Sequence, residues 1–311
     1  MLQGPIPTVR YRNAVAFLAL GAIWGSAFVA IKAGLASIPP VLFAALRYDI
    51  AGVLVLGYAA IVTDPLPESR RDLAAIAVGA TLLIAGYHAL LFVGELETTS
   101  ATAAVVVSLS PVLTAGFARI ALPEERLSTL GVLGLGLGFA GVVVIARPEP
   151  GRLLSSDVLG PVLVFGAALS FALGSVLTRW LDADLSIEAM EGWSMVGGAL
   201  LMHLLSLVLG ESPAAIEWTP SAVLSLGYLS LVASALGFLV YFDLLDRLGP
   251  VEINLVSYVA PVFAALTGFL FLGEIIDIAT AGGFVVILLG FVLLKRDAIR
   301  ETVGGRLEGE T

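Results

Sequence analysis

The sequence predicts an all-α integral membrane protein whose ten transmembrane helices form two inverted repeats of five helices each. Composition, the number of long apolar stretches and an internal repeat lead to this prediction. The chain has 311 residues, of which 59% are hydrophobic and 13% are charged, and its mean hydropathy is +1.01. Soluble proteins carry roughly 25% charged residues. The composition therefore indicates a membrane protein.

Ten stretches are long and apolar enough to cross a bilayer, which takes about 20 residues each. They lie near 14–34, 40–62, 73–94, 98–119, 127–145, 157–180, 188–209, 220–243, 250–271 and 278–295. Short connections rich in proline, glycine and acidic residues separate most of them. The first stretch lacks a small-x-small cleavage signal, so we expect it to remain in the protein as a helix.

The stretch from Ser100 to Glu124 is repeated 150 residues later, from Pro250 to Glu274. The residues that recur are Val106, Pro111, Val112, Ala115, Leu122 and Glu124, matched by Val256, Pro261, Val262, Ala265, Leu272 and Glu274. Each copy has one proline near its middle, and a proline inside a helix removes one backbone hydrogen bond. We therefore predict matched helix breaks at Pro111 and Pro261, which would act as hinges. Paired interruptions of this kind are typical of transporters built from internal repeats.

The positions of the basic residues predict the orientation of the chain. We expect a first repeat at 1–146, a seam at 147–152, a second repeat at 153–296 and a flexible cytoplasmic tail at 297–311. With the N-terminus inside, twelve Lys and Arg residues lie on the cytoplasmic side, against Arg147 and Arg152 outside. We expect the protein to lie in the inner membrane of the cell. The positive-inside rule then places both of its termini in the cytoplasm. Five helices per half require the second repeat to be inverted, which suits alternating access.

Several motifs resemble the drug/metabolite transporter superfamily, and most closely its EamA-type branch of ten-helix transporters. They are the run Trp24–Phe28 (WGSAF), Lys32, Pro39-Pro40, Ala45-Leu46-Arg47 and the paired residues Pro111/Pro261 and Glu124/Glu274. The resemblance covers nearly the whole chain. It implies a central cavity lined by helices one to four and six to nine, and export of amino acids or related metabolites, as in YddG-type exporters. Asp49 departs from the family pattern, which usually has small or apolar residues there.

Three charged residues lie inside the predicted helices. Asp49 is about 13 Å into its helix at 1.5 Å per residue, which is close to the midplane, and ionisable residues there are candidates for function. It would carry a proton or bind a substrate ammonium; the alternative is that it neutralises Lys32 or Arg47. Lys32 is near a helix end, where it can reach the interface in a structural role; the alternative is an electrostatic role in gating. Arg47 would gate the cavity, attract a carboxylate or form a salt bridge.

The remaining candidates for the cavity are aromatic or polar. His88 titrates near neutral pH and is a candidate proton acceptor, with Tyr87 beside it, although a packing role is the alternative. Trp24 lies in mid-helix, where its ring suits a cavity wall, and Tyr258 is its expected counterpart in the second repeat. We place His203 at the interface. Secondary polar lining, with helix packing as the alternative for each residue, is expected from Ser108, Ser110, Tyr241, Asn254 and Ser257.

Two patterns carry no chemistry. The run Gly136–Gly141 matches G-x-G-x-x-G, but it lies inside an apolar helix without the strand that a dinucleotide site needs. We interpret these glycines, with Gly134, as a close helix-packing face. Two separate histidines and no cysteine give no metal site, and no cofactor is expected. The expected partners are a small-molecule substrate and the lipid bilayer, without nucleic acid, in a monomer; a dimer through the fifth or tenth helix is the alternative.

The function predicted is a secondary exporter of small metabolites, chiefly aromatic or other neutral amino acids. Import, export of xenobiotics or other metabolites, and transport of nucleotide-linked sugars are alternatives within transport. Few cationic residues are available for a polyphosphate, which argues against the last of these. An intramembrane lipid-modifying enzyme would need a cluster of catalytic groups that the sequence does not show. A structural membrane component would not require the inverted repeat. Because the sequence shows no cluster of catalytic groups, we do not expect an enzyme.

Overall fold

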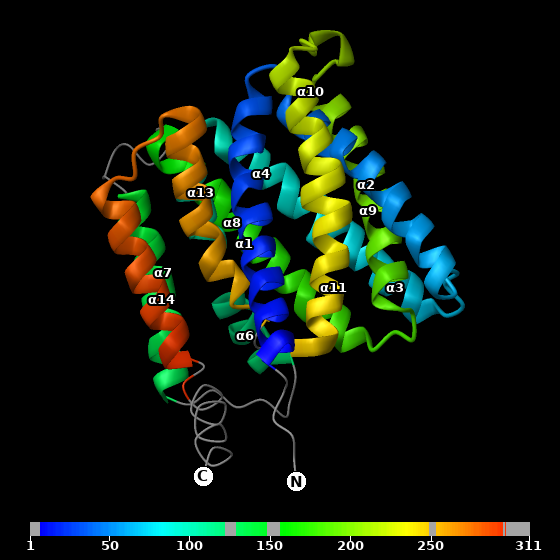
Figure 1. The fold of residues 1–311 in the computed structure, drawn as a ribbon, viewed down its shortest axis with the longest axis horizontal. Coiled ribbons are helices and arrows are strands. Elements are labelled where there is room, and N and C mark those ends of the chain that lie inside the picture. Colours follow the sequence, from blue (N-terminus) through cyan, green and yellow to red (C-terminus); the bar gives the residue numbers. More distant parts are fainter. Residues whose placement is uncertain (1–6, 122–128, 148–155, 249–252, 295, 297–311) are drawn as a thin grey trace.

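The computed structural model describes residues 7–121, 129–147, 156–248, 253–294 and 296, and these residues form an all-helical bundle (Figure 1). Seven of the helical segments are long and apolar enough to cross a membrane, and three shorter apolar helices lie at 130–146, 256–272 and 278–294. A helix of 17 residues is about 26 Å long, close to the ~30 Å of a bilayer core. Across the described residues, the predicted all-α fold of ten transmembrane segments is confirmed.

The first half of the chain contributes five segments. Two are uninterrupted helices, α1 (Pro7–Leu35) and α2 (Pro40–Val62). The third consists of α3 (Arg70–Val78), the π-helix η1 (Gly79–Gly86) and α4 (Tyr87–Leu96). The fourth is divided into α5 (Ser100–Val107) and α6 (Ser110–Ala121), and the fifth is α7 (Thr129–Ala146).

The second half repeats this order. It begins with α8 (Ser156–Leu181) and α9 (Ile187–Val208), followed by a short 3-10 helix, η2 (Pro213–Ala215). The eighth segment consists of α10 (Pro220–Gly227), the π-helix η3 (Tyr228–Leu236) and α11 (Gly237–Leu248). The last two are α13 (Val256–Leu272) and α14 (Ile278–Leu294). A π-helical stretch therefore interrupts the third segment of each half.

The start of α1 and the end of α14 lie at the same end of the bundle, which we call the near end (Figure 1). The opposite end, where α1 is followed by α2 and α4 by α5, is called the far end. The two halves interlock: α1 packs along α13, and α8 packs against α4 and α6. The second helices of the two halves, α2 and α9, pack on each other, as do the fifth, α7 and α14. This exchange of neighbours is that of two inverted repeats.

The glycine-rich face of α7 packs against α14, as the sequence predicts. A Cβ atom built on Gly134 would lie 2.5 Å from the carbonyl oxygen of Gly290, and one on Gly141 would lie 2.8 Å from that of Gly283. Both contacts are reciprocal, since a Cβ on Gly290 or Gly283 would meet the oxygen of its partner at the same distance. Only glycine allows the two backbones to approach this closely. The face is thus used within the chain, and a dimer through these helices stays a prediction.

Of the two helix breaks expected at prolines, one is present. Helix α5 ends at Val107 and α6 starts at Ser110, so that Pro111 lies in a first turn, where its missing N–H costs nothing. The break expected at Pro261 is wrong, because α13 runs through this residue without interruption. A close contact with α1 supports that segment: a Cβ on Gly25 would lie 2.4 Å from the carbonyl oxygen of Ala260. The paired Glu124 lies outside the described residues.

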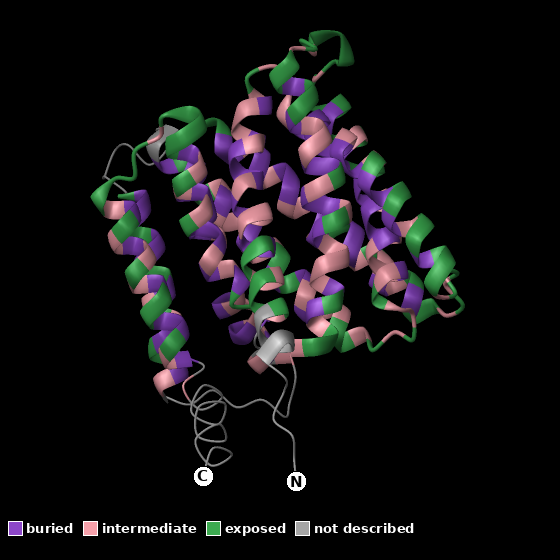
Figure 2. Cartoon of the chain, in the orientation of Figure 1, coloured by how far each residue is buried: buried purple, intermediate pink, exposed green. Residues whose placement is uncertain are grey.

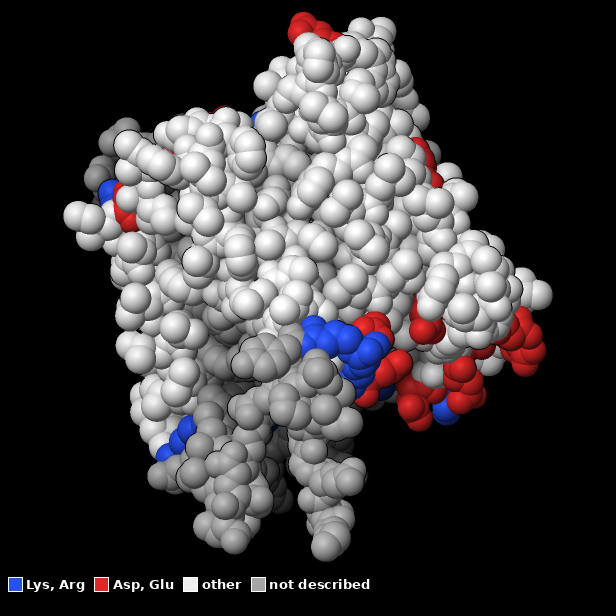
Figure 3. All heavy atoms as spheres, viewed as in Figure 1, with Lys and Arg blue, Asp and Glu red and all other residues white. Residues whose placement is uncertain are grey.

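The distribution of side chains agrees with a position in lipid. Buried residues line the inner faces of the helices, and exposed ones cover the outside (Figure 2). Large apolar side chains are among the exposed residues, for example Val53, Ile61, Leu204 and Phe271. In the view of Figure 3, charged side chains of the described residues gather at the two ends and leave an uncharged band between them. The protein is therefore an integral membrane protein with apolar surface facing the acyl chains.

Candidate functional site

A buried arginine lies at the centre of the bundle. Arg47 is the eighth residue of α2, about 10 Å from the start of this helix, and only 6% of its surface is exposed. Its Nε donates a hydrogen bond of 2.9 Å to Oγ of Ser234 in η3, and its guanidinium carbon lies 5.0 Å from the ring centroid of Tyr48. No carboxylate of the described residues lies within ion-pair distance of it. A guanidinium keeps its charge, so this buried cation has no counter-ion among the residues that the structure describes.

A tyrosine–histidine pair continues the polar centre. The Tyr48 hydroxyl and Nε2 of His88 are 2.6 Å apart, and Nδ1 of His88 is 2.9 Å from the carbonyl oxygen of Ile84. A carbonyl can only accept, so Nδ1 carries a proton; with a neutral imidazole, Nε2 then accepts the hydrogen bond of the hydroxyl. Both ring nitrogens are satisfied in this arrangement. His88 also makes edge contacts with the rings of Tyr87 and Phe92.

The two π-helices position these groups. A backbone carbonyl has two lone pairs and can accept a side-chain donor beside its backbone one, and π-helical turns are frequent at functional sites. In η1 the oxygen of Ile84 accepts from His88, and that of Leu82 accepts from the Ser170 hydroxyl. In η3 the oxygen of Ala233 accepts from Nε1 of Trp24 at 3.1 Å, beside the Ser234 hydroxyl that binds Arg47. The matched π-helices thus supply ligands to the centre from both halves.

Aromatic rings form a second part of the site. Trp24 of α1 packs against Phe238 and Tyr241 of α11, with ring centroids 6.1 Å and 5.6 Å away. The Tyr228 hydroxyl of η3 donates to the carbonyl oxygen of Ile23, which ties the same two segments together. Trp24 and Tyr241, both predicted for the cavity, are therefore neighbours, and η3 joins their group to Arg47.

Asp49 lies away from this centre. Its Oδ2 is 2.7 Å from Nε2 of His203 in α9, and the two side chains are 42% and 34% exposed. The alternative in which Asp49 neutralises Lys32 or Arg47 is wrong, because Asp49 pairs with His203 while Lys32 binds backbone carbonyls and Arg47 binds Ser234. His203, which the sequence places at the interface, is the partner of Asp49, and its depth in the bilayer stays a prediction.

Other predicted residues have contacts elsewhere in the bundle. The ring of Tyr258 packs at a tilt against Phe291 of α14, with ring centroids 4.5 Å apart, and its role as a counterpart of Trp24 stays a prediction. The Ser108 hydroxyl donates to the carbonyl oxygen of Val105 at the break between α5 and α6. Asn254 is exposed in a turn that precedes α13. Whether these residues contact a substrate stays a prediction.

Lys32 binds the end of a neighbouring helix. Its Nζ donates to the carbonyl oxygens of Glu95, Leu96 and Thr98, at 2.6, 3.1 and 3.0 Å. These carbonyls belong to the C-terminus of α4 and the residues after it, where a helix has free acceptors and partial negative charge. Lys32 therefore joins α1 to the far end of α4.

Sequence reasoning did not select Tyr48, Ser234 or Glu95. Tyr48 adjoins Arg47 in the sequence, and its aromatic neighbour His88 was a candidate, so this pair had a weak signal. Ser234 also had a weak signal, since Ser225, Ser230 and Ser234 recur within the mostly apolar run 222–240. Their meeting with Arg47 depends on η3, and a π-helix has no sequence signature.

At the far end, carboxylates of the second half bind backbone N–H groups of the first half. Oε1 and Oε2 of Glu211 accept from the N–H groups of Val41 and Leu42, at 3.1 and 2.7 Å, in the first turn of α2. Glu274 likewise accepts from the N–H of Ser100, at 3.2 and 3.1 Å, in the first turn of α5. Carboxylates at helix N-termini are stabilised by free N–H groups and by the helix dipole.

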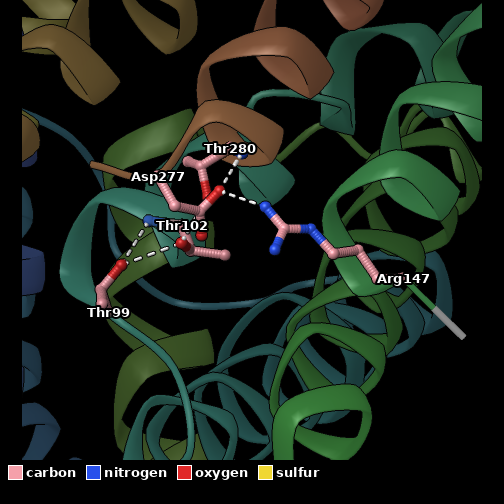
Figure 4. A network of polar contacts seen from close by, with 5 residues as sticks. All are labelled: Thr99, Thr102, Arg147, Asp277 and Thr280. Carbon is pink, nitrogen blue, oxygen red and sulfur yellow. Dashed lines mark hydrogen bonds and ion pairs between the residues drawn. The ribbon is translucent and has the colours of Figure 1, made fainter. Parts of the chain in front are cut away.

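Side chains complete the closure at one edge of the far end (Figure 4). Oδ1 of Asp277 accepts from the N–H of Thr280 at 2.8 Å and from Nη2 of Arg147 at 2.9 Å. The hydroxyls of Thr102 and Thr280 are 3.0 Å apart, and Thr99 donates to Thr102 at 2.8 Å. The network joins the end of α7 and the start of α5 to the start of α14.

Two hollows in the described part of the molecule lie outside the centre. One is lined by Ala265, Leu266, Phe269, Glu274, Ile275 and Ile276, and the other by Arg71, Trp180, Leu181 and Asp182. Neither includes a residue that the sequence assigns to the cavity. The central cavity that the sequence predicts stays a prediction.

A membrane protein with two interlocked inverted halves and polar groups buried between them has the organisation of a secondary transporter. The chain belongs to the EamA-like transporter family, whose model matches residues 12–147 and 158–296. It is therefore a membrane transporter.

Several relatives cover most of the chain. The uncharacterized inner membrane transporter YedA of Escherichia coli K12 is 31% identical over 253 residues, which is 81% of this chain and 80% of YedA. The uncharacterized transporter YvbV of Bacillus subtilis is 30% identical over 93% of each chain. A probable terminal-alkyne amino-acid exporter of Streptantibioticus cattleyicolor is 28% identical, also over 93% of each. A protein of known crystal structure shares the fold, with a TM-score of 0.65 and 24% identity over 94% of this chain and 99% of that one.

Proposed function

We propose that this transporter exports neutral amino acids, and that Arg47 binds the carboxylate of the substrate. The observation that carries this proposal is the buried guanidinium that no carboxylate of the described residues neutralises. An uncompensated charge is costly in the interior. A substrate carboxylate would remove this cost through charge-assisted, bidentate hydrogen bonds.

The aromatic group supports a substrate with an apolar or aromatic side chain. Trp24, Phe238 and Tyr241 provide ring faces beside η3, the same segment whose Ser234 binds Arg47. An amino acid bound with its carboxylate on Arg47 could place its side chain against these rings. A relative described as a probable amino-acid exporter agrees with this substrate class.

The interlocked halves support alternating access. In this conformation, Glu211 and Glu274 of the second half hold helix starts of the first half at the far end. Opening the far end would break these contacts and expose the centre from that side. If the termini are cytoplasmic, as the basic residues predict, the far end is the outside, and its opening would release the exported substrate.

Exchange of radiolabelled phenylalanine by proteoliposomes tests the proposal. We expect the wild-type protein to exchange phenylalanine, while phenylalanine amide, which has no carboxylate, competes poorly. Arg47→Gln should reduce exchange by about tenfold or more, because truncating one member of a buried charge pair costs about 2–5 kcal/mol. Trp24→Ala should weaken phenylalanine exchange more than alanine exchange.

Arg71→Gln is the matched control, since it makes the same replacement at an exposed residue. This variant should exchange phenylalanine at the wild-type rate. Equal competition by the amide, or unchanged exchange by folded Arg47→Gln protein, would remove Arg47 from the binding of a carboxylate. No exchange of any amino acid by the wild-type protein would favour xenobiotics or other metabolites as substrates.

A further inference from the structure

One carboxyl group at the far end is buried without a partner. Glu95 is the second-last residue of α4, its exposed surface is 0%, and neither Oε1 nor Oε2 has a hydrogen-bond partner. Buried polar groups are nearly always hydrogen-bonded. An intramembrane carboxyl that lacks such partners is a candidate for function.

The charged groups around Glu95 do not bind its carboxyl oxygens. Lys32 of α1 acts on it electrostatically, yet the Lys32 ammonium binds the backbone oxygen of Glu95 and two other carbonyls. Glu274, after α13, and Arg47 of α2 are the other charges that act on it, and Glu274 binds the N–H of Ser100.

The other elements that pack on α4 add little charge. The sequences of η1 and α5 contain no charged residue. In α8, Arg179 lies at the near end, and the side chain of Asp157 lies outside the described residues. The Glu95 carboxyl is therefore enclosed by one cation and one anion at the far end, with a second cation deeper in the bundle.

This environment favours the neutral acid while the far end is closed. An ionised carboxylate without hydrogen bonds or an ion pair is much more costly to bury than a neutral carboxylic acid. Opening the far end would separate α4 and α5 from the second half and admit water to Glu95. The ionised group would then be hydrated, and Lys32 of α1, whose ammonium already binds backbone carbonyls of the last turn of α4, could pair with it.

We propose that Glu95 is a proton-binding site of this transporter and that the far end closes only when this site is occupied. The inference rests on the proposed alternating access, and it assigns the pH sensitivity of the cycle to Glu95 rather than to Asp49 or His88. Asp49 is paired with His203 on a half-exposed face, and both nitrogens of His88 are engaged. Acid on the far side would favour closure, and alkali would favour opening.

The test uses the absence of cysteine from the chain, because a single introduced thiol then reports on one position. Ala101→Cys places it beside Ser100 in the closed far end, where Ala101 is 3% exposed. Ala214→Cys, in the exposed η2 turn, corrects for the pH dependence of the maleimide reaction itself. The measurement is the ratio of the two labelling rates in reconstituted full-length protein as the pH rises.

With Glu95 present, we expect the ratio of labelling at position 101 to labelling at position 214 to rise at least about fivefold as the pH rises. With Glu95→Gln, which imitates the neutral acid, the ratio should stay low at every pH. The same rise in both backgrounds, or no rise in the wild type, would overturn the proposal. An infrared measurement on the Cys-free wild type does not depend on the folding of a variant. The band of a protonated carboxyl should disappear over the pH range in which labelling increases, and a band that persists would also overturn it.

The two proposals can fail separately. Labelling reports on the opening of the far end whether or not phenylalanine is the substrate, whereas exchange reports on the substrate. Normal phenylalanine exchange with pH-independent labelling would retain the exporter and remove the role of Glu95. Labelling that responds to pH through Glu95, without exchange of any amino acid, would retain the proton site and remove the substrate.

Discussion

Replacing Gly134 with alanine would test how closely α7 and α14 pack. The added Cβ would lie 2.5 Å from the carbonyl oxygen of Gly290, 3.0 Å from the backbone nitrogen of Leu294 and 3.3 Å from its Cβ. An ordinary contact begins at 3.4 Å, so the helices would have to separate by about 0.9 Å at this point. A backbone oxygen cannot rotate away as the end of a side chain can, and both helices must move to relieve the contact.

The cost follows from this geometry. Overpacking a tight interface typically costs about 1–3 kcal/mol. Alanine also gains up to about 1 kcal/mol over glycine in helix propensity. Gly136→Ala is the matched control, because nothing lies within 4 Å of a Cβ at that position. Both variants share the gain in propensity, so the difference between them isolates the contact and should be about 1–3 kcal/mol.

Thermal unfolding of the two purified variants, followed by tryptophan fluorescence in the same detergent, measures this difference. At about 2–4 °C per kcal/mol, the Tm of Gly134→Ala should lie several degrees below that of Gly136→Ala. Adding Gly290→Ala should cost less than its separate effect, because the two residues share one contact. Equal Tm values for Gly134→Ala and Gly136→Ala would refute the packing described here.

Two further predictions concern ionisable residues. Glu211→Ala removes the acceptor of the Val41 and Leu42 N–H groups at the start of α2. We expect the free energy of unfolding to fall by about 1–2 kcal/mol, which a lower Tm would show. The isosteric Glu211→Gln should lower the Tm less. An unchanged Tm for Glu211→Ala would show that water satisfies these groups equally well. Asp49→Asn and His203→Gln each remove one member of a half-exposed pair. A double-mutant cycle on Tm should give a coupling energy of at most about 1 kcal/mol. Phenylalanine exchange by both variants should stay within about twofold of the wild type. A tenfold loss of exchange in Asp49→Asn would instead place this carboxylate at the substrate.

The membrane class and the number and order of the helices follow from the sequence because the bilayer imposes simple rules. Each crossing needs a long apolar stretch, and each loop tolerates proline and charge, so the segment near 188–209 corresponds to α9 at Ile187–Val208. The glycine face of α7 was predictable as well, because close packing in lipid requires small residues at helical spacing.

The rotation of the helices was not predictable, and the site depends on it. Most of α2 is apolar on every side, since one side faces lipid and the other faces a protein core. Hydropathy therefore cannot tell whether Arg47 or Asp49 points inward, although their spacing shows that both cannot. The π-helices add to this difficulty, because one extra residue per turn changes the direction of every later side chain in the segment, including His88. Pro261 shows the same limit, since tertiary packing keeps its helix continuous.

Closure of the far end through backbone N–H groups has a consequence for how the sequence can vary. Glu211 and Glu274 bind the main chain of Val41, Leu42 and Ser100. A side-chain lock would require coordinated replacement on both halves. Here any residue with a free N–H at positions 41 and 42 can donate to Glu211, whereas Ser100 donates its hydroxyl as well as its N–H to Glu274. The contact of Glu211 therefore constrains the side chain of the second half more than those of the first, whereas Thr102 and Thr280 are paired through side chains from both halves.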